Sequence, residues 1–202
     1  MALGILGGTF NPVHIGHMVL AQDALERLEL AQVLFVPCRL PPHKDASRLL
    51  AAERRLAMLE LALEGDLRFA VLDTEIRRDG ISYSVDTVRE IRRLHPESDI
   101  SFIIGMDTLM ELHLWKDIDE LFELCRFVPF RRPGIDTAVV TEESLKLKPP
   151  WPERLLSSVK TGHTVDVSST DIRRRVAEGL SIRYLVPPPV EMYIQEHHLY
   201  GR

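Results

Sequence analysis

The chain has 202 residues, of which 45% are hydrophobic and 27% charged, values that are ordinary for one globular domain with a sizeable core. The net charge of −5 argues against general binding to nucleic acid or to an anionic membrane, so any phosphate site must be local. The N-terminal apolar run is too short for a signal peptide and nothing approaches the length of a membrane span, so we expect a cytoplasmic protein.

The first predicted elements surround a glycine turn. An apolar run over 2–6 predicts a buried strand, and the helical spacing of apolar residues predicts a helix over 15–28. The apolar face of that helix carries Ile15, Met18, Val19, Leu25 and Leu28. Between the strand and the helix lies the stretch Gly7-Gly8-Thr9-Phe10-Asn11-Pro12-Val13-His14-Ile15-Gly16-His17.

This turn predicts an anion site. A strand, a glycine turn and a helix start surround a small space with backbone N–H groups and the positive end of a helix dipole, which suits phosphate. His14 and His17 stand three residues apart and can point the same way, and Gly16 lets a ligand approach the backbone. The two common nucleotide fingerprints, G-x-G-x-x-G and G-x-x-x-x-G-K-[ST], are absent. The alternative is a tight turn with one capping and one core histidine, and the rarity of the combination favours the anion site.

A short buried strand is predicted over 33–36, followed by an ordered extended loop over 37–44 that contains three prolines. His43 and Lys44 end this loop near the carboxyl end of a strand, where open α/β sheets bind ligands. Cys38 in this loop and the distant Cys125 form no metal pattern, so we expect two reduced, mostly buried thiols.

The middle of the chain continues the alternation of helices and strands. Helices are predicted over 51–63 and 84–94, strands over 69–72, 101–105 and 126–129, and a charged loop over 73–82. In the first of these helices Leu56, Leu59 and Leu63 are expected to face inward. Ser84 is expected to cap the second helix, and Asp107 to cap the helix that opens at Gly105. Asp107 also stands where it could meet a ribose or a base, because it follows the carboxyl end of a strand.

The last third of the chain is expected to begin with a loop over 136–151, where the pattern is weak and proline is frequent. A last strand is predicted over 164–167, then a helix that starts in Ser168-Ser169-Thr170 and stops at Gly179, and a final helix over 190–197. We therefore predict a Rossmann-like α/β fold: a doubly wound parallel sheet with helices on both faces, in one domain over 1–202. Its C-terminal helical portion begins at about 169.

The start of the helix at Ser168 predicts a second half of the anion site. The hydroxyls of Ser169 and Thr170, the free N–H groups and the guanidinium of Arg173 in the first turn would clamp a phosphate. Arg174 and Arg175 point elsewhere around the helix and are expected to be surface groups.

These motifs resemble a known family. The elements His-x-Gly-His and Ser-Ser-Thr-x-Ile-Arg are similar to the two signatures of the nucleotidylyltransferase superfamily, the first of which class I aminoacyl-tRNA synthetases share. Within the superfamily, the chain resembles the bacterial nicotinate-nucleotide adenylyltransferases over 4–17, 37–44, 82–87, 102–115, 167–173 and 182–200. The resemblance implies adenylyl transfer from ATP to nicotinate mononucleotide, which gives deamido-NAD and pyrophosphate in NAD biosynthesis.

The resemblance also implies a role for each matching residue. The phosphates of ATP would be held by Gly8, Thr9, Phe10, His14 and His17, its ribose by Gly105 and Asp107, and the triphosphate would be closed off by Ser169, Thr170 and Arg173. The catalytic donors among them would be His14, His17 and Arg173. The mononucleotide's phosphate would meet His43 and Lys44, its carboxylate the backbone of Tyr83 and Ser84, and its pyridine ring Trp115. No protein metal site is expected, and Mg²⁺ would bind mainly through the phosphates of ATP.

Several alternatives stay open. Asn11 stands where the family usually has an aspartate. Asparagine keeps an oxygen that can cap the turn, but it lacks the charge, which weakens any proposal of a metal site there. Trp115 could be an ordinary core residue. The acceptor could be nicotinamide mononucleotide, phosphopantetheine or a polyol phosphate, or the protein could be a nucleotide-binding regulator without catalysis. A dinucleotide oxidoreductase is disfavoured by the missing fingerprint and a tRNA synthetase by the chain length. The oligomeric state is open, and a homo-oligomer is allowed.

Overall fold

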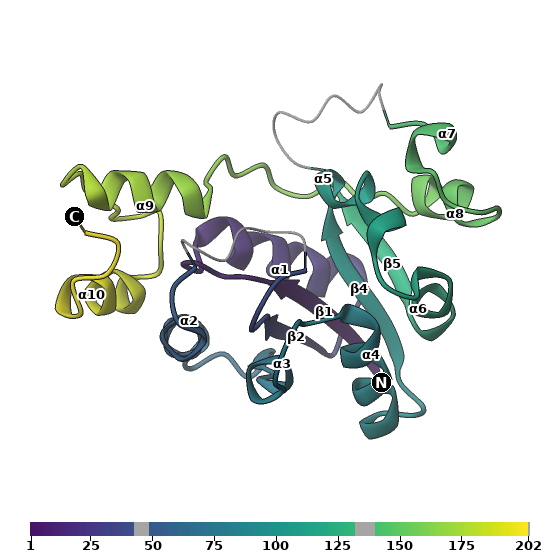
Figure 1. The fold of residues 1–202 in the computed structure, drawn as a ribbon, viewed down its shortest axis with the longest axis horizontal. Helices are drawn as coiled ribbons and strands as arrows, with labels where there is room; N and C mark the ends of the chain where they lie inside the picture. The colour runs from purple at the N-terminus through teal and green to yellow at the C-terminus, as the bar shows by residue number, and fades with distance from the viewer. Residues whose placement is uncertain (43–48, 132–139, 202) are drawn as a thin grey trace.

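The computed structural model describes residues 1–42, 49–131 and 140–201. At its centre lies a five-stranded parallel sheet of order β3-β2-β1-β4-β5 (Figure 1). The strands are β1 (Ala2–Gly8), β2 (Gln32–Pro37), β3 (Phe69–Val71), β4 (Asp99–Gly105) and β5 (Arg126–Phe130). Ile5 of β1 pairs with Leu34 on one side and Phe102 on the other, so the chain winds outward from β1 in both directions. The doubly wound parallel sheet was therefore correctly predicted.

Helices cover both faces of the sheet. The helical elements are α1 (Ile15–Arg27), α2 (Ala52–Leu63), α3 (Thr74–Arg77), α4 (Ser84–Leu94), α5 (Met106–Leu109), the 3₁₀ turn η2 (Leu112–Leu114), α6 (Ile118–Leu124), α7 (Glu142–Leu145), α8 (Trp151–Ser157), α9 (Ser169–Ala177) and α10 (Pro188–Glu196). Leu6 and the strand residues on the same face of the sheet pack against α1, α2, α9 and α10. Ile5 and the strand residues on the other face pack against α4, α6 and α8. Apolar side chains on both faces are what a buried parallel sheet requires.

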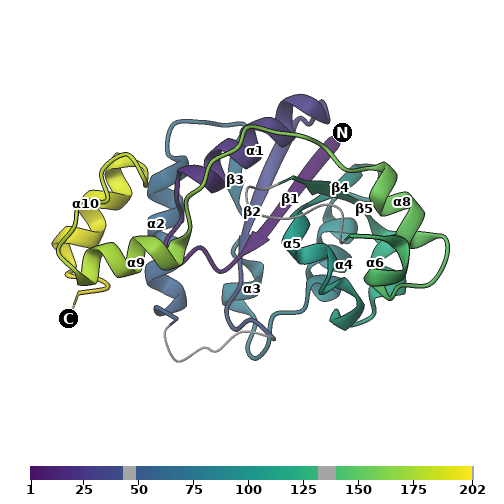
Figure 2. The same cartoon turned by 90° about the horizontal axis from the view of Figure 1, so that it is seen from above.

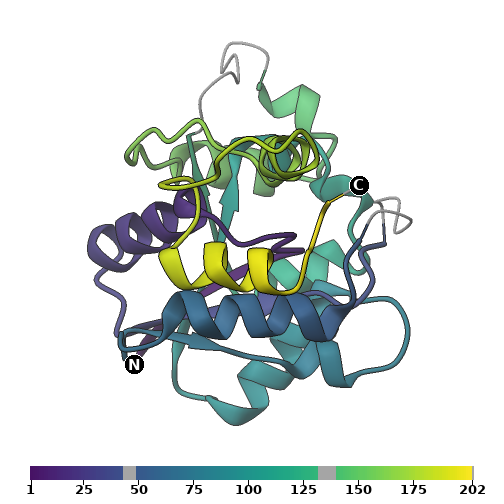
Figure 3. The same cartoon turned by 90° about the vertical axis from the view of Figure 1, so that its left-hand side faces the viewer.

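The C-terminal helices close one side of the molecule. Figure 3 shows α10 lying along α2, and the guanidinium of Arg54 donates to the hydroxyl of Tyr193 at 3.3 Å between them. The segment between α8 and α9 passes over α1 on its way to the same side (Figure 2). The backbone N–H and the ring Nδ1 of His163 in this segment contact the carboxylate of Asp23 on α1, at 2.6 and 2.7 Å. Two distant parts of the chain are thus tied together over the sheet.

The predicted last strand over 164–167 is wrong. The chain makes a bridge between Phe130 and Lys160, and residues 161–168 then lie outside helices and strands, with residues 164–168 alternately exposed and half-buried. That alternation is typical of a strand, but here it arises because the segment lies over α1 and is held by Asp23. The stretch expected to be a loop over 136–151 contains α7 and the start of α8, and α3 lies inside the expected loop over 73–82.

Smaller differences concern helix ends and faces. Tyr83 caps α4 in place of Ser84, and Gly105 caps α5 in place of Asp107, which lies in the first turn. The buried face of α1 consists of Leu20, Ala21, Asp23, Ala24 and Leu25, whereas Ile15, Met18 and Val19 are half-buried. In α2 the fully buried residues include Arg55 and Met58, and Leu56 is half-buried. Neither Cys38, which is half-buried, nor the buried Cys125 forms a disulfide, and burial raises the pKa of Cys125 to about 12. Within the described ranges, no helix combines the length and apolar character needed to cross a membrane.

Candidate active site

A cleft of about 280 Å³ opens at the carboxyl ends of β1, β2 and β4. Open α/β sheets bind their ligands at this edge, where the winding reverses. The cleft is lined by Gly8, Thr9, His17, Tyr83, Ser84, Gly105, Asp107 and Trp115, all of which the sequence singled out. The structure therefore brings the glycine turn and the start of α4 to one space, although they are more than 60 residues apart in sequence.

The glycine turn after β1 rests on an aromatic side chain. Phe10 has a positive φ of 45° and is 1% exposed, and its ring packs against Phe35 and edge-on against His17. A Cβ on Gly8 would lie 3.2 Å from that ring, a tight contact that the buried ring could relieve only by shifting, so glycine suits this close approach. A bulky residue in the left-handed region is strained, which is typical of a turn held in shape for function. Phe10 thus supports the turn from the core side, and its ring is not part of the cleft lining.

The two histidines stack at the entrance of α1. Their ring centres are 3.7 Å apart at an angle of 28°, with His14 buried and His17 half-buried against the cleft. The backbone N–H of His14 donates to Nδ1 of His17 at 3.2 Å. A neutral imidazole that accepts at Nδ1 carries its proton at Nε2, so His17 is fixed as a donor through Nε2. A phosphate oxygen is a suitable acceptor for that donor.

The start of α4 and the tryptophan form the other end of the cleft. Tyr83 caps the helix with its carbonyl, which accepts from the N–H groups of Asp86 and Thr87. Trp115 is half-buried, and its ring packs edge-on against Phe102 and Phe127 at 5.7 and 6.0 Å while it also lines the cleft. Trp115 therefore packs in the core and also lines the cleft, and its contact with a pyridine ring stays a prediction.

The first turn of α9 meets the glycine turn through the backbone. Ser168 caps the helix, with its hydroxyl accepting from the N–H of Asp171, as predicted. The hydroxyl of Ser169 donates to the carbonyl of Pro12 at 2.9 Å, and Nη1 of Arg173 donates to the carbonyl of Asn11 at 2.8 Å. Nη2 of Arg173 reaches Thr170 at 3.2 Å. These residues join the histidine turn as expected, but they are not among those lining the cleft. His43 and Lys44 lie outside the described residues.

Comparison with known proteins agrees with this geometry. The family model described as cytidylyltransferase-like matches residues 5–175. The probable nicotinate-nucleotide adenylyltransferases of Geobacillus thermodenitrificans and Halalkalibacterium halodurans are each 42% identical to this chain, over 98% of it and over 86% and 90% of their own lengths. The chain belongs to the nicotinate-nucleotide adenylyltransferase family.

Solved structures of the family share the fold. The nicotinic acid mononucleotide adenylyltransferase of Plasmodium falciparum complexed with APC matches with a TM-score of 0.73 at 16% identity, over 98% of this chain and 96% of that one. The same enzyme complexed with NaAD matches with a TM-score of 0.72 at 18% identity, over 98% and 97%. At these identities the likeness concerns the fold.

Asn11 ties the family's glycine turn to the C-terminus in this chain. It is 4% exposed, and its Oδ1 accepts from the hydroxyl of Tyr200 at 2.8 Å and from the N–H of Leu50 at 3.4 Å. The amide oxygen thus links the turn to two distant segments, the one before α2 and the C-terminus. Burial raises the pKa of Tyr200 well above its ordinary value, so its hydroxyl stays protonated as a donor.

Sequence reasoning missed Arg55 of α2. Its guanidinium is fully buried and donates to the carbonyls of Thr9, Leu50 and Arg39 at 2.7, 2.9 and 3.1 Å. Three carbonyls satisfy the fork of donors that a buried arginine needs, and they belong to the glycine turn and to the loop after β2. The available signal was an arginine on the inner face of an amphipathic helix, beside Met58 and Leu59.

Three charged residues of the cleft wall were also missed, Glu75, Glu111 and Lys116. Glu75 lies in α3 and is 7% exposed, and its carboxylate accepts from the hydroxyl of Thr87 at 2.5 Å. Burial raises the pKa of Glu75, and hydrogen bonds from Thr87 and Ser82 partly offset that rise. No group of three or more metal-ligating side chains gathers anywhere in residues 1–42, 49–131 and 140–201.

Proposed function

We propose that this protein transfers the adenylyl group of ATP to nicotinate mononucleotide and releases pyrophosphate, forming deamido-NAD. The observation that carries the proposal is the shared cleft, in which the turn with Gly8 and His17 faces the start of α4 and Trp115. Family membership at 42% identity over nearly the whole chain agrees with it. The first end suits a triphosphate, and the second suits an aromatic ring that carries an anion.

The reaction needs no side-chain nucleophile. A phosphate oxygen of the mononucleotide attacks the α-phosphorus of ATP in line, and the bond from that phosphorus to the bridging oxygen of pyrophosphate breaks. The attacking phosphate is already ionised, so the protein contributes by positioning two anions and stabilising the charge on the phosphoryl oxygens. His17 donates from Nε2, the turn donates from its backbone, and Arg173 reaches the triphosphate from α9 when it leaves the carbonyl of Asn11.

Magnesium fits this scheme as a partner of the substrate. Mg²⁺ on the triphosphate neutralises part of its charge when bound, and it keeps most of its ligands from phosphate and water. Asn11 holds a neutral amide where a carboxylate would attract a metal, and its oxygen is already hydrogen-bonded to Tyr200. The residues of the described ranges therefore fit a metal carried in by ATP.

Pyrophosphate release tests the proposal directly. Purified protein is given ATP and Mg²⁺ with nicotinate mononucleotide and, separately, with nicotinamide mononucleotide or phosphopantetheine. We expect strong release with the acid mononucleotide. Release with phosphopantetheine alone would move the protein to another acceptor class, and release with none of them would support a nucleotide-binding regulator.

A further inference from the structure

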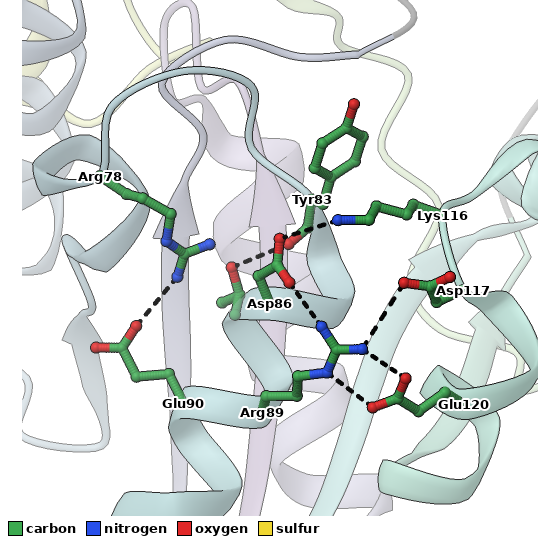
Figure 4. Close-up of polar contacts among 9 residues, drawn as sticks. Arg78, Tyr83, Asp86, Arg89, Glu90, Lys116, Asp117 and Glu120 are labelled. Carbon is green, nitrogen blue, oxygen red and sulfur yellow. Dashed lines mark hydrogen bonds and ion pairs between the residues drawn. The ribbon is translucent and has the colours of Figure 1, made fainter.

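A lysine stands beside the acceptor end of the cleft. Lys116 follows Trp115 directly, and its side chain reaches the first turn of α4 (Figure 4). Its ammonium lies 4.6 Å from the centre of the Tyr83 ring and 3.7 Å from Oδ2 of Asp86. The side chain is 43% exposed and lines the cleft together with Tyr83, Ser84 and Trp115.

The neighbouring charges leave this ammonium able to take a ligand. Oδ1 of Asp86 accepts from Arg89 at 2.8 Å, and Arg89 also makes two bonds to Glu120, at 2.7 and 2.5 Å, and an ion pair with Asp117 at 3.7 Å. The 3.7 Å between Lys116 and Asp86 exceeds hydrogen-bond length, so charge alone holds the two together. Arg89 therefore pairs with Asp86, Asp117 and Glu120, and Lys116 can bind a new anion without losing a hydrogen bond to Asp86 (Figure 4).

We propose that Lys116 recognises the carboxylate of the pyridine ring and sets the preference for the acid mononucleotide over the amide. The role depends on the proposed function, because it concerns the acceptor of that reaction. A ring held by Trp115 with its substituent toward the start of α4 presents that substituent to the ammonium beside Tyr83. A carboxylate gains a charge-assisted hydrogen bond there, whereas the NH₂ of a carboxamide faces a cation.

Steady-state kinetics of Lys116→Gln test the role, with Lys148→Gln as the matched control. Lys148 is an exposed lysine that pairs with Asp119 at 2.5 Å and does not line the cleft. For Lys116→Gln we expect KM for nicotinate mononucleotide to rise about tenfold, while KM for nicotinamide mononucleotide, KM for ATP and kcat change less than about twofold. Lys116→Arg should keep most of the preference. The advantage of the acid in the wild type should shrink as salt is raised, since the ammonium is partly exposed.

Asp86→Asn separates recognition from a structural role. If Lys116 only anchors α4 through Asp86, Asp86→Asn and Lys116→Gln raise KM in the same way. Under the proposal, Asp86→Asn leaves KM for the acid unchanged or lowers it, because a competing anion has gone. Equal losses for both mononucleotides would overturn the carboxylate role in favour of a phosphate contact, and no change would overturn it outright.

Calorimetric binding of the two mononucleotides gives a readout that does not need turnover. A wild type that binds the acid more tightly, with the difference lost in Lys116→Gln alone, supports the role of Lys116. If the wild type releases pyrophosphate while Lys116→Gln and Lys148→Gln both keep the preference for the acid, the role of Lys116 is refuted and the proposed function is not. A wild type that binds neither mononucleotide refutes the proposed function and with it the role of Lys116.

Discussion

His17 combines a fixed tautomer with a place on the cleft wall. Because the N–H of His14 occupies Nδ1, the ring presents Nε2 as a donor in a single orientation. A donor fixed before the substrate arrives needs no reorganisation when charge develops on the phosphoryl oxygens. The adjacent Phe10 ring, edge-on at 5.0 Å, limits rotation of the imidazole. The geometry of one side chain is thus set by two neighbours in the same turn, His14 and Phe10.

Replacing His17 should remove catalysis and leave the fold. We expect His17→Ala to lower kcat by about 100-fold or more, because a preorganised donor is lost, with a melting temperature close to that of the wild type. The exposed His197, far along the chain at the end of α10, provides the control, since His197→Ala should keep its kcat. Near-normal turnover of His17→Ala would show that this histidine is not a catalytic donor.

Glu75 should make stability depend on pH. Its pKa in the folded protein is raised by burial above the ordinary value of 4.5, so the folded state holds this proton more tightly than the unfolded state does. As the pH rises above 4.5, unfolding is therefore accompanied by loss of that proton, and the free energy of unfolding falls. Glu75→Gln removes this fall and keeps an oxygen that can accept from Thr87. Urea unfolding of both proteins at pH 4.5 and 7.5 should show the variant gaining relative stability at the higher pH, and a pH-independent difference would contradict this.

At the scale of elements, the segment between α8 and α9 depends on one carboxylate. Asp23 is 3% exposed and receives the backbone N–H and the ring of His163, and a Cβ on Gly162 would lie 2.5 Å from its Oδ2. The segment therefore passes α1 at a distance only glycine allows, and it leads directly to the residues that start α9. In place of the backbone hydrogen bonds that the expected strand would have formed, this side-chain contact holds the segment against α1.

Asp23→Asn should destabilise the protein by about 2 kcal/mol, because an amide cannot replace both charge-assisted acceptors of a buried site. His163→Ala keeps the backbone bond and should cost less, about 0.5–1 kcal/mol, since its ring is largely exposed. Urea denaturation of the two variants measures both effects. Equal losses would mean that the ring, and not the backbone N–H, carries the contact.

The elements that sequence predicted well are those with a strong local cause. Strands β1, β2 and β4 are apolar runs, and α9 has a serine cap and a glycine stop, so their patterns depend little on the rest of the chain. The segment over 164–167 has the alternation of a strand, but whether it joins the sheet is decided by Asp23, 140 residues away from His163. The roles of Arg55 and Lys116 were not predicted for the same reason, because their contact partners belong to other elements. The strand ends that form the cleft could be predicted from the sequence. The charged residues Glu75, in the short helix α3, and Lys116, in the loop before α6, could not be placed there.

For the whole molecule, the two ends of the chain meet at the glycine turn. Tyr200 donates to Asn11 across 189 residues of sequence, Arg173 donates to the carbonyl of the same asparagine, and Arg55 of α2 donates to the carbonyl of Thr9. The turn is therefore gripped by α2, α9 and the C-terminal segment together. The geometry of this site therefore depends on the C-terminal segment having folded against the turn.

A double-mutant cycle on Tyr200 and Asn11 measures that coupling. Tyr200→Phe keeps the ring and removes the donor, which leaves a buried acceptor and should lower the free energy of unfolding by about 1 kcal/mol. Asn11→Ala should cost more, because the N–H of Leu50 loses its acceptor as well. The double variant should be less destabilised than the sum of the two by about 1 kcal/mol, since the shared bond is counted in both single variants. Strict additivity in urea unfolding would mean that the C-terminal tyrosine packs beside the turn without holding it. A clear coupling would show that the last residues of the chain stabilise the first motif through this one hydrogen bond.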